Sequence, residues 1–284
     1  MTDKIAWITD TAAFLLPEFI ATHHIHVLPL QIVFEEGALR ETVDMTHVEF
    51  YDKLNAAKTH PKTSQPTFGE HVALYERLKA EGYDYAIAIH TSEQLSGTVL
   101  SAPMAAEQAG FTSYVIDAKI GSYPMQKMIE LGLSLAAQGA TAEEIVRDIT
   151  AMTKRGQLAF IPASLQQLHK SGRVSGTAMF ISNILNIKLV IAYNKEGGVE
   201  VVQKVRADKR AQKYVTDLLQ EAVEQAGVNE VAIIHCNNMG QALTWQAQLE
   251  TQFPHITFIP TELSACVGVH AGEGTVGLSW VREA

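Results

Sequence analysis

The chain has 284 residues, 47% of them hydrophobic, and is therefore long enough to bury a large core. Its 31 acidic residues outnumber the 22 lysines and arginines, which gives a formal net charge of -9 and no basic run that could follow the phosphates of a nucleic acid. The same acidic balance excludes stable residence on an anionic membrane surface and leaves only transient membrane contact.

Residues 1–7 carry charges before a strand-like run and lack the apolar region of a signal peptide, so we expect a cytoplasmic location. Cys236 and Cys266 are far apart and show neither a CxxC pair nor a zinc-ligand spacing, so we expect reduced core thiols and no metal site. The most apolar stretch, residues 179–193, is too short to span a bilayer and is interrupted by polar residues. We interpret it as a buried helix that runs into a strand.

Along the first half of the chain, short runs of β-branched and aromatic residues alternate with helical patterns. We expect strands at residues 5–8, 27–33, 85–90 and 113–117. Capping boxes mark three helix starts, at Thr46 with Glu49, Thr67 with Glu70 and Thr141 with Glu144. Pro17 suits the first turn of another helix, and one more helix begins just after Ser96-Gly97-Thr98. The alternation predicts an α/β fold with a mainly parallel sheet flanked by helices.

The pattern changes after Gly156, where a second series of elements begins. We expect strands at residues 157–161, 187–193, 199–205, 231–235 and 256–260, and helices at 208–226 and 239–252. Gly197-Gly198 predicts a hairpin turn between two of these strands. We expect an N-terminal α/β domain, 1–156, and a second α/β domain, 157–284. Strands from the far C-terminus could also join the sheet of the first domain.

Two segments rich in hydroxyl groups are candidates for binding a ligand. Residues 62–67 are expected to form a loop that offers Thr63 and Ser64 as donors, although such residues also gather in loops for purely local reasons. Residues 91–98 follow a strand and include Ser96 and Gly97 at a helix start, where free amides and the helix dipole favour an anion. The alternative is that Ser96 only caps the helix.

A third candidate is His270, expected on a glycine-rich loop where it could donate to a carboxylate or pair with its charge. The glycines at 272, 274 and 277 formally spell GxGxxG, but too little chain follows them for a dinucleotide-binding unit. Ser96 and His270 could also serve an enzyme that acts on an acyl ester or a small carboxylate, although no G-x-S-x-G elbow is present. No P-loop and no H-E-x-x-H pattern occurs.

Taken together, the residues of these motifs and their order along the chain resemble those of the DegV family. This family includes the fatty-acid-binding subunits of bacterial fatty acid kinase. The resemblance runs through nearly the whole chain. It is carried by Ile8-Thr9-Asp10, Leu28-Pro29-Leu30, Lys62-Thr63-Ser64-Gln65-Pro66, Leu95-Ser96-Gly97-Thr98, Val115-Ile116-Asp117, Ser171-Gly172-Arg173-Val174, Leu185-Asn186-Ile187-Lys188 and Gly268-Val269-His270.

The resemblance implies a two-domain protein that buries a long acyl chain between its domains and holds the carboxylate on Thr63, Ser96 and His270, with Ser64 and Gly97 beside them. It further implies that the chain has no catalytic residue and no cofactor of its own. A separate ATP-binding kinase subunit would phosphorylate the carboxylate and supply an acyl phosphate to phospholipid synthesis.

Arg173 would help to dock that kinase, as the resemblance implies, and Arg206 in a second basic segment would extend the same surface. An arginine beside a glycine on a loop is also, by itself, compatible with an ordinary solvated charge. Residues 179–191 are candidates for the acyl slot and equally for ordinary core. Besides the lipid carrier and the enzyme, a third interpretation remains open, in which the protein binds another small anion.

The sequence departs from the family pattern at several positions. Asp10 is followed by Thr11 and then Ala12, where many members carry two hydroxyls, and Leu189 stands where proline is frequent. Glu273 also occupies a common proline position. Its negative charge is expected to lie near the bound carboxylate, where it could raise the pKa of that group or tune the preference for acyl chains.

Overall fold

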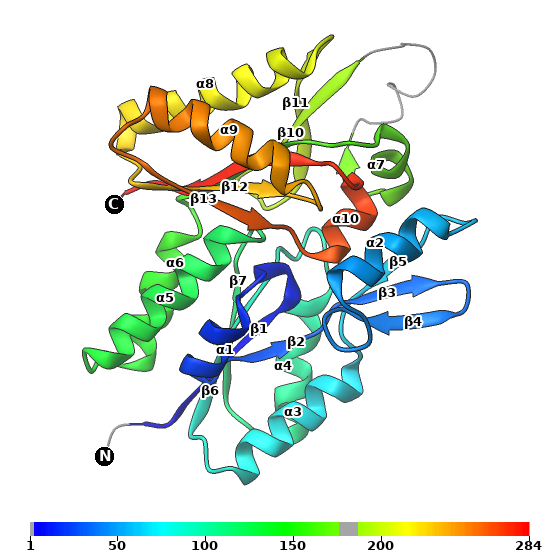
Figure 1. The fold of residues 1–284 in the computed structure, drawn as a ribbon. Helices are drawn as coiled ribbons and strands as arrows, with labels where there is room; N and C mark the ends of the chain where they lie inside the picture. The colour runs from blue at the N-terminus through cyan, green and yellow to red at the C-terminus, as the bar shows by residue number, and fades with distance from the viewer. Residues whose placement is uncertain (1–2, 176–186, 284) are drawn as a thin grey trace.

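The computed structural model describes residues 3–175 and 187–283 (Figure 1). The N-terminal half contains a four-stranded parallel sheet with the strand order β2-β1-β6-β7. Its strands are β1 (Ile5–Asp10), β2 (His26–Leu28), β6 (Tyr85–His90) and β7 (Ser113–Asp117). The helices of this half are α1 (Pro17–His23), α2 (His47–Ala56), α3 (Phe68–Ala80), α4 (Thr98–Ala109), α5 (Tyr123–Ala137) and α6 (Ala142–Met152).

The two faces of this sheet are buried against different helices. Successive residues of a strand point to opposite faces, so Ala6 and Ile8 of β1 pack with α3 and α4, whereas Trp7 packs on the side of α5 and α6. Trp7 lies so close to Gly132 of α5 that a β-carbon there would overlap its ring. Burial on both faces explains why β6 is apolar along nearly its whole length.

A small antiparallel sheet lies beside the first one, with the order β4-β3-β5. It is formed by β3 (Gln31–Phe34), β4 (Gly37–Arg40) and β5 (Lys62–Ser64). The expectation of one strand at 27–33 is therefore wrong, because the chain leaves β2 before Pro29, which lacks an amide donor, and pairs with a new partner from Gln31. The expectation of a loop at 62–67 is wrong for its first three residues, which form β5.

The C-terminal half contains a seven-stranded mixed sheet with the order β13-β12-β14-β8-β10-β11-β9. Its strands are β8 (Gly156–Ile161), β9 (Val174–Ser175), β10 (Lys188–Tyr193), β11 (Val199–Val205), β12 (Glu230–His235), β13 (Thr257–Glu262) and β14 (Val276–Val281). Figure 1 shows α8 (Asp208–Ala226) and α9 (Met239–Gln252) on its outer face. The short helices α7 (Leu165–Ser171) and α10 (Ala265–Ala271) lie on the side of the first half.

The largest core cluster joins the two halves, since it contains Ile87 and Ile89 of the first sheet and Phe160 and Ile191 of the second. The final strand, β14, lies in the seven-stranded sheet between β12 and β8. The preceding helix α10 instead packs against α2, β3 and β5 of the N-terminal half. The C-terminal segment therefore connects both halves although its strand stays in the second sheet.

Several local predictions are confirmed. All three capping boxes form, with both the side-chain and the backbone contacts present at Thr46, Thr67 and Thr141. Gly197 adopts a φ of +89° in the turn of the antiparallel β10–β11 hairpin. The predicted strand at 187–193 is confirmed as β10, whereas the helix predicted before it falls at residues 176–186, outside the described ranges. Within those ranges, no helix combines the length and the apolar character needed to cross a bilayer.

Candidate ligand-binding site

A cavity of about 690 Å³ lies between the two halves of the molecule. It begins at the carboxyl ends of the first sheet, where Ala12 follows β1 and Thr91 follows β6, and it reaches Leu158 and Phe160 on β8 of the second sheet. This position matches the crevice beyond strand ends in which open α/β sheets collect ligands. The volume falls within the roughly 300–1,000 Å³ of small-molecule sites.

Thr63 and His270 meet at one wall of this cavity. Thr63 Oγ1 lies 2.8 Å from His270 Nε2, although the two residues are 207 positions apart. The contact exists because β5 pairs with β3 and α10 packs against both strands. His270 thus lies on a helix, α10, and the expectation of a loop is wrong. The helix points the imidazole at Thr63.

Burial in this wall, the charge of Arg173 and the proximity of His60 lower the pKa of His270 from 6.5 to about 3. Without a ligand the imidazole is therefore neutral near pH 7, which favours donation to a carboxylate over charge pairing, the two roles expected of His270. The His270–Thr63 hydrogen bond fits two tautomers of the imidazole. In the first, Nε2 accepts from the Thr63 hydroxyl, and the protonated Nδ1 has no partner among the described residues. In the second, Nε2 donates to Thr63, and the proton of the Thr63 hydroxyl is free to bind another group. The Nδ1 atom is itself buried, so the Thr63 hydroxyl of the second arrangement is the donor that a ligand in the cavity can receive.

Ser96 and Gly97 form a second wall of the cavity, at the start of α4. Gly97 is the N-cap and supplies no side-chain hydrogen bond to the helix. Ser96 precedes the cap, and its Oγ lies 2.8 Å from Thr98 Oγ1 and 3.4 Å from the Thr98 amide nitrogen. A β-carbon at Gly97 would overlap the side-chain amide of Gln65, so the missing side chain leaves room for this amide at the helix start.

The predicted ligand residues are therefore brought together: Thr63, Ser64, Ser96, Gly97 and His270 all line the same cavity. The arrangement differs from that of a serine hydrolase, in which the base binds the nucleophile hydroxyl. Here the His270 Nε2 atom contacts Thr63, and the Ser96 hydroxyl contacts Thr98. The geometry favours a set of donors for an anion over a nucleophile and base.

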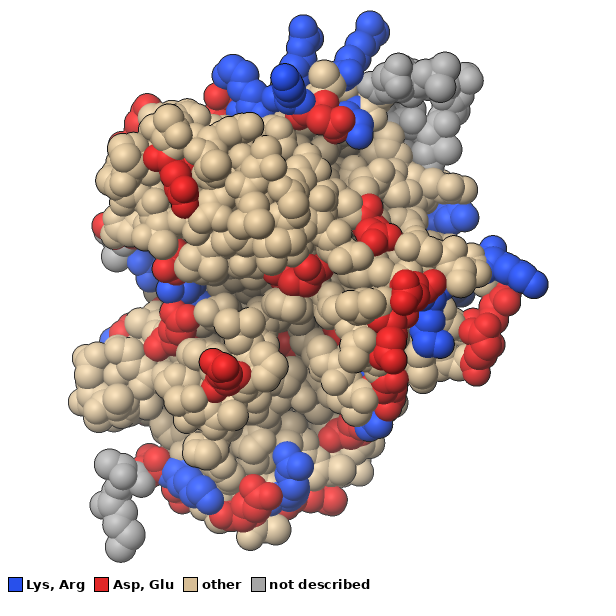
Figure 2. Space-filling view, in the orientation of Figure 1, with Lys and Arg blue, Asp and Glu red and all other residues tan. Residues whose placement is uncertain are grey.

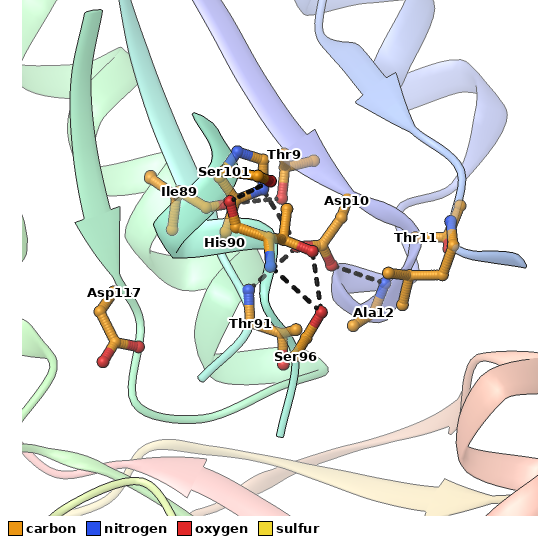
Figure 3. A network of polar contacts seen from close by, with 12 residues as sticks. Thr9, Asp10, Thr11, Ala12, Ile89, His90, Thr91, Ser96, Ser101 and Asp117 are labelled. Carbon is orange, nitrogen blue, oxygen red and sulfur yellow. Dashed lines mark hydrogen bonds and ion pairs between the residues drawn. The ribbon is translucent and has the colours of Figure 1, made fainter. Parts of the chain in front are cut away.

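Two buried carboxylates behind the cavity were missed as site residues. Asp10 is fully buried at the end of β1, where it accepts from the Ala12 amide at 3.0 Å, the Thr91 amide at 3.0 Å and His90 Nδ1 at 3.1 Å (Figure 3). These bonds tie the ends of β1 and β6 to each other. The sequence signals for Asp10 were its position just after a predicted buried strand and its place in the family motif Ile8-Thr9-Asp10.

Glu41 is the second carboxylate and is 1% exposed. It accepts from the Thr11 hydroxyl at 2.7 Å and from the backbone amide of Ala265, the first residue of α10. A carboxylate at a helix start stabilises the helix through its free amides and its dipole. Glu41 therefore positions the helix that carries His270. Thr11, in turn, is engaged with Glu41, and the cavity wall at this point is the methyl group of Ala12.

Arg173 lines the cavity, although it was predicted as a partner-binding residue. Its guanidinium donates to the Ser171 carbonyl at 2.9 Å, and its charge adds to burial in lowering the pKa of His270. Arg206 is exposed at the far end of β11, whereas β9, next to Arg173, pairs with the beginning of that strand. The two arginines are thus about 25 Å apart at the usual rise of a strand, and their role in binding a partner stays a prediction.

Arg206 belongs to a different basic cluster. Figure 2 shows lysine and arginine side chains gathered over the start of α8. The exposed members of this cluster are Lys204, Arg206, Lys209, Arg210 and Lys213.

Glu273 lies outside the cavity wall, where its carboxylate accepts from Asn55 at 2.7 Å and from Asn237 at 2.6 Å. Its expected effect on a bound carboxylate has no support in this arrangement. Leu189 is buried in the core between the two halves. Within the described residues, no group of three or more histidine, cysteine, aspartate or glutamate side chains is arranged to hold a metal ion.

Comparison with known proteins gives one consistent match. The model of the DegV family of uncharacterised proteins matches residues 4–283. The crystal structure of DegV, described as a fatty acid binding protein, from Bacillus subtilis is 31% identical, covers 99% of this chain and 100% of its own, and superposes with a TM-score of 0.88. A fatty acid binding DegV family protein from Streptococcus agalactiae is 29% identical over 99% and 100% of the two chains, with a TM-score of 0.90.

A more distant structure shares the fold. The fatty acid kinase B3 protein of Streptococcus pneumoniae, loaded with linoleic acid, is 22% identical, covers 100% of both chains and has a TM-score of 0.83. The family model spans nearly the whole chain, and the solved structures share its architecture from end to end. The chain belongs to the DegV family.

Proposed function

We propose that this protein binds a long-chain fatty acid in the cavity between its two halves, with the carboxylate held by Thr63, Ser96 and His270. The observation that carries the proposal is the hydrogen-bonded Thr63–His270 pair beside an uncapped helix start, at one side of a cavity whose remaining walls are largely apolar. The relatives from B. subtilis and S. agalactiae are described as fatty acid binding proteins.

The apolar walls support an acyl chain as the guest. Leu30, Leu158, Phe160, Leu168 and Val199 all line the cavity. Each methylene moved from water into such surroundings contributes ~0.8 kcal/mol, so a long chain gains affinity in proportion to the length it buries. A small hydrophilic anion would leave these walls in contact with water.

The polar residues support a carboxylate as the head group. The free amides at the start of α4 favour an anion, and Ser64 and Gly97 lie beside the three principal residues. Arg173 lines the same cavity and adds a positive charge. Because His270 is neutral without a ligand, an incoming carboxylate would meet hydrogen-bond donors first, and its negative charge would raise the pKa of the imidazole.

The proposed role is that of a carrier that presents its lipid to an enzyme. A separate ATP-binding kinase subunit would transfer the terminal phosphoryl group of ATP to a carboxylate oxygen, releasing ADP and forming an acyl phosphate for phospholipid synthesis. The S. pneumoniae protein of the same fold is named as part of a fatty acid kinase. Arg173 at the cavity would approach the transferred phosphate, and Arg206 would contact the kinase from the separate basic cluster. The carrier would work in the cytoplasm and exchange lipid during transient membrane contact.

Mass spectrometry of lipid released by denaturing the purified protein tests the binding proposal. We expect one fatty acid per chain, and a reduced load in Thr63→Val and in His270→Ala. The matched control is Thr150→Val on α6, whose residue is exposed and outside the cavity. Absence of lipid, together with ester hydrolysis that Ser96→Ala abolishes, would instead support the enzyme reading. Affinity that does not change with acyl length would support a binder of another small anion.

The kinase proposal needs a separate assay. The loaded protein is mixed with ATP and the ATP-binding subunit of a bacterial fatty acid kinase, and acyl phosphate is trapped with hydroxylamine. We expect Arg206→Gln to lower the rate of acyl phosphate formation while the lipid load stays unchanged. Arg147→Gln is the control, because Arg147 is exposed on α6 away from both arginines. Equal rates for the two variants would contradict the docking role of Arg206.

A further inference from the structure

The cavity between the two halves contains a phenol hydroxyl that the carboxylate site does not use. It belongs to Tyr193, at the end of β10, whose ring packs against the core cluster that joins the halves. The hydroxyl oxygen has no hydrogen-bond partner among the described residues, and it is not sealed off from the cavity. A hydroxyl without a partner in largely apolar surroundings costs free energy that a hydrogen-bonding ligand atom would recover.

The Tyr193 hydroxyl lies beside Gly121, a residue of the β7–α5 loop that lines the same cavity. A β-carbon on Gly121 would lie 3.4 Å from the Tyr193 hydroxyl oxygen, 3.5 Å from Thr91 Oγ1 and 3.9 Å from the Ala12 carbonyl oxygen. Apart from the chain neighbours of Gly121, these three oxygens are the nearest atoms to that position. The missing side chain leaves the two hydroxyl groups uncovered. We call this group, Ala12, Thr91, Gly121 and Tyr193, the polar niche.

The polar niche suits a neutral oxygen that can both donate and accept. Thr91 Oγ1 donates to the Ile120 carbonyl at 3.3 Å, which leaves its oxygen able to accept, and the Tyr193 hydroxyl can donate. A second anion fits poorly, because the Asp10 carboxylate lies behind the niche. Its charge adds to burial in raising the pKa of Tyr193, and it would repel another negative group.

We propose that the polar niche binds a hydroxyl group on the hydrocarbon chain of the lipid, so that the protein takes hydroxylated fatty acids as ligands. This rests on the proposed function, which places the acyl chain in the same cavity. An unsubstituted chain gains nothing from the Tyr193 hydroxyl, since phenylalanine would offer the same ring. A chain hydroxyl regains in the niche the hydrogen bonds that it gives up on leaving water, whereas along the apolar walls it stays unpaired.

Binding titrations with stearic acid and its isomers that carry one hydroxyl at successive carbon atoms test the proposal. We expect one position, or two adjacent positions, at which the hydroxy acid binds at least as tightly as stearic acid, and weaker binding at the others. Tyr193→Phe should weaken the preferred hydroxy acid by about three- to tenfold and change the affinity for stearic acid by less than about twofold. Gly121→Ala should also weaken the preferred hydroxy acid, because the added methyl group would cover both hydroxyls.

Tyr114→Phe is the matched control, because Tyr114 is a half-buried tyrosine of β7 that lies outside the cavity. Thermal unfolding verifies that each variant folds. Weaker binding of every hydroxylated isomer, or a Tyr193→Phe variant that weakens hydroxylated and unsubstituted acids alike, would overturn the proposal while fatty acid binding stands. If neither stearic acid nor any isomer binds the wild-type protein, the proposal and the proposed function fail together.

Discussion

Replacement of His270 should make the stability of the protein less sensitive to acid. The folded chain lowers the pKa of His270 from 6.5 to about 3, first through burial and then through the charge of Arg173. Between these two values the unfolded chain binds a proton that the folded chain does not, so stability falls as the pH falls from 6.5 toward 3. One such proton changes stability by ~1.4 kcal/mol per pH unit.

After a discount for the partial exposure of the imidazole, His270 should account for about 2 kcal/mol of the stability lost between pH 7 and pH 4.5. The assay is urea unfolding of delipidated wild type and His270→Gln at both pH values. We expect the free energy of unfolding of the variant to fall about 2 kcal/mol less than that of the wild type. His255→Gln, at an exposed position, is the control. Equal acid sensitivity of wild type and His270→Gln would refute the conclusion that the buried imidazole is neutral.

Three further substitutions test the framework of the site. Gly97→Ala should weaken lipid binding, because the added β-carbon overlaps the Gln65 amide. Adding Gln65→Ala to this variant should restore lipid binding. A double variant that binds lipid as weakly as Gly97→Ala would contradict the steric explanation. Glu41→Gln should lower the free energy of unfolding by about 1–3 kcal/mol in a urea titration, because one carboxylate accepts from both Thr11 and α10. Thr141→Ala should cost ~1 kcal/mol through loss of its cap, and should leave lipid affinity unchanged in a binding titration.

The local features of the fold could be predicted from the sequence because their causes are local. A capping box needs only a hydroxyl and a carboxylate three residues apart, and Thr46, Thr67 and Thr141 all form one. The strand Tyr85–His90 is likewise visible as a short apolar run. Features of this kind depend on few contacts from elsewhere in the chain.

The errors have non-local causes. Lys62–Ser64 is a strand because β3 lies beside it, and nothing in its three polar residues indicates that pairing. His270 lies on a helix whose first amide is bound by Glu41, 224 positions away.

The residues of the candidate site also differ in whether the local sequence is enough to predict them. Ser96 and Gly97 could be recognised by local reasoning, because a glycine at a helix start after a strand indicates an anion site. The prediction of Thr63 and His270 depended mainly on the family resemblance, since 207 residues separate them in the sequence.

The central claim is that the donors around Thr63 and Ser96 hold the carboxylate of a fatty acid. Its most direct test is a carbon-13 NMR titration of delipidated protein with a fatty acid labelled at the carboxyl carbon. One bound resonance is predicted, and it should shift in Thr63→Val and in Ser96→Ala but not in Ser101→Ala, a serine of α4 outside the cavity. A bound resonance that is identical in all three variants would contradict the account.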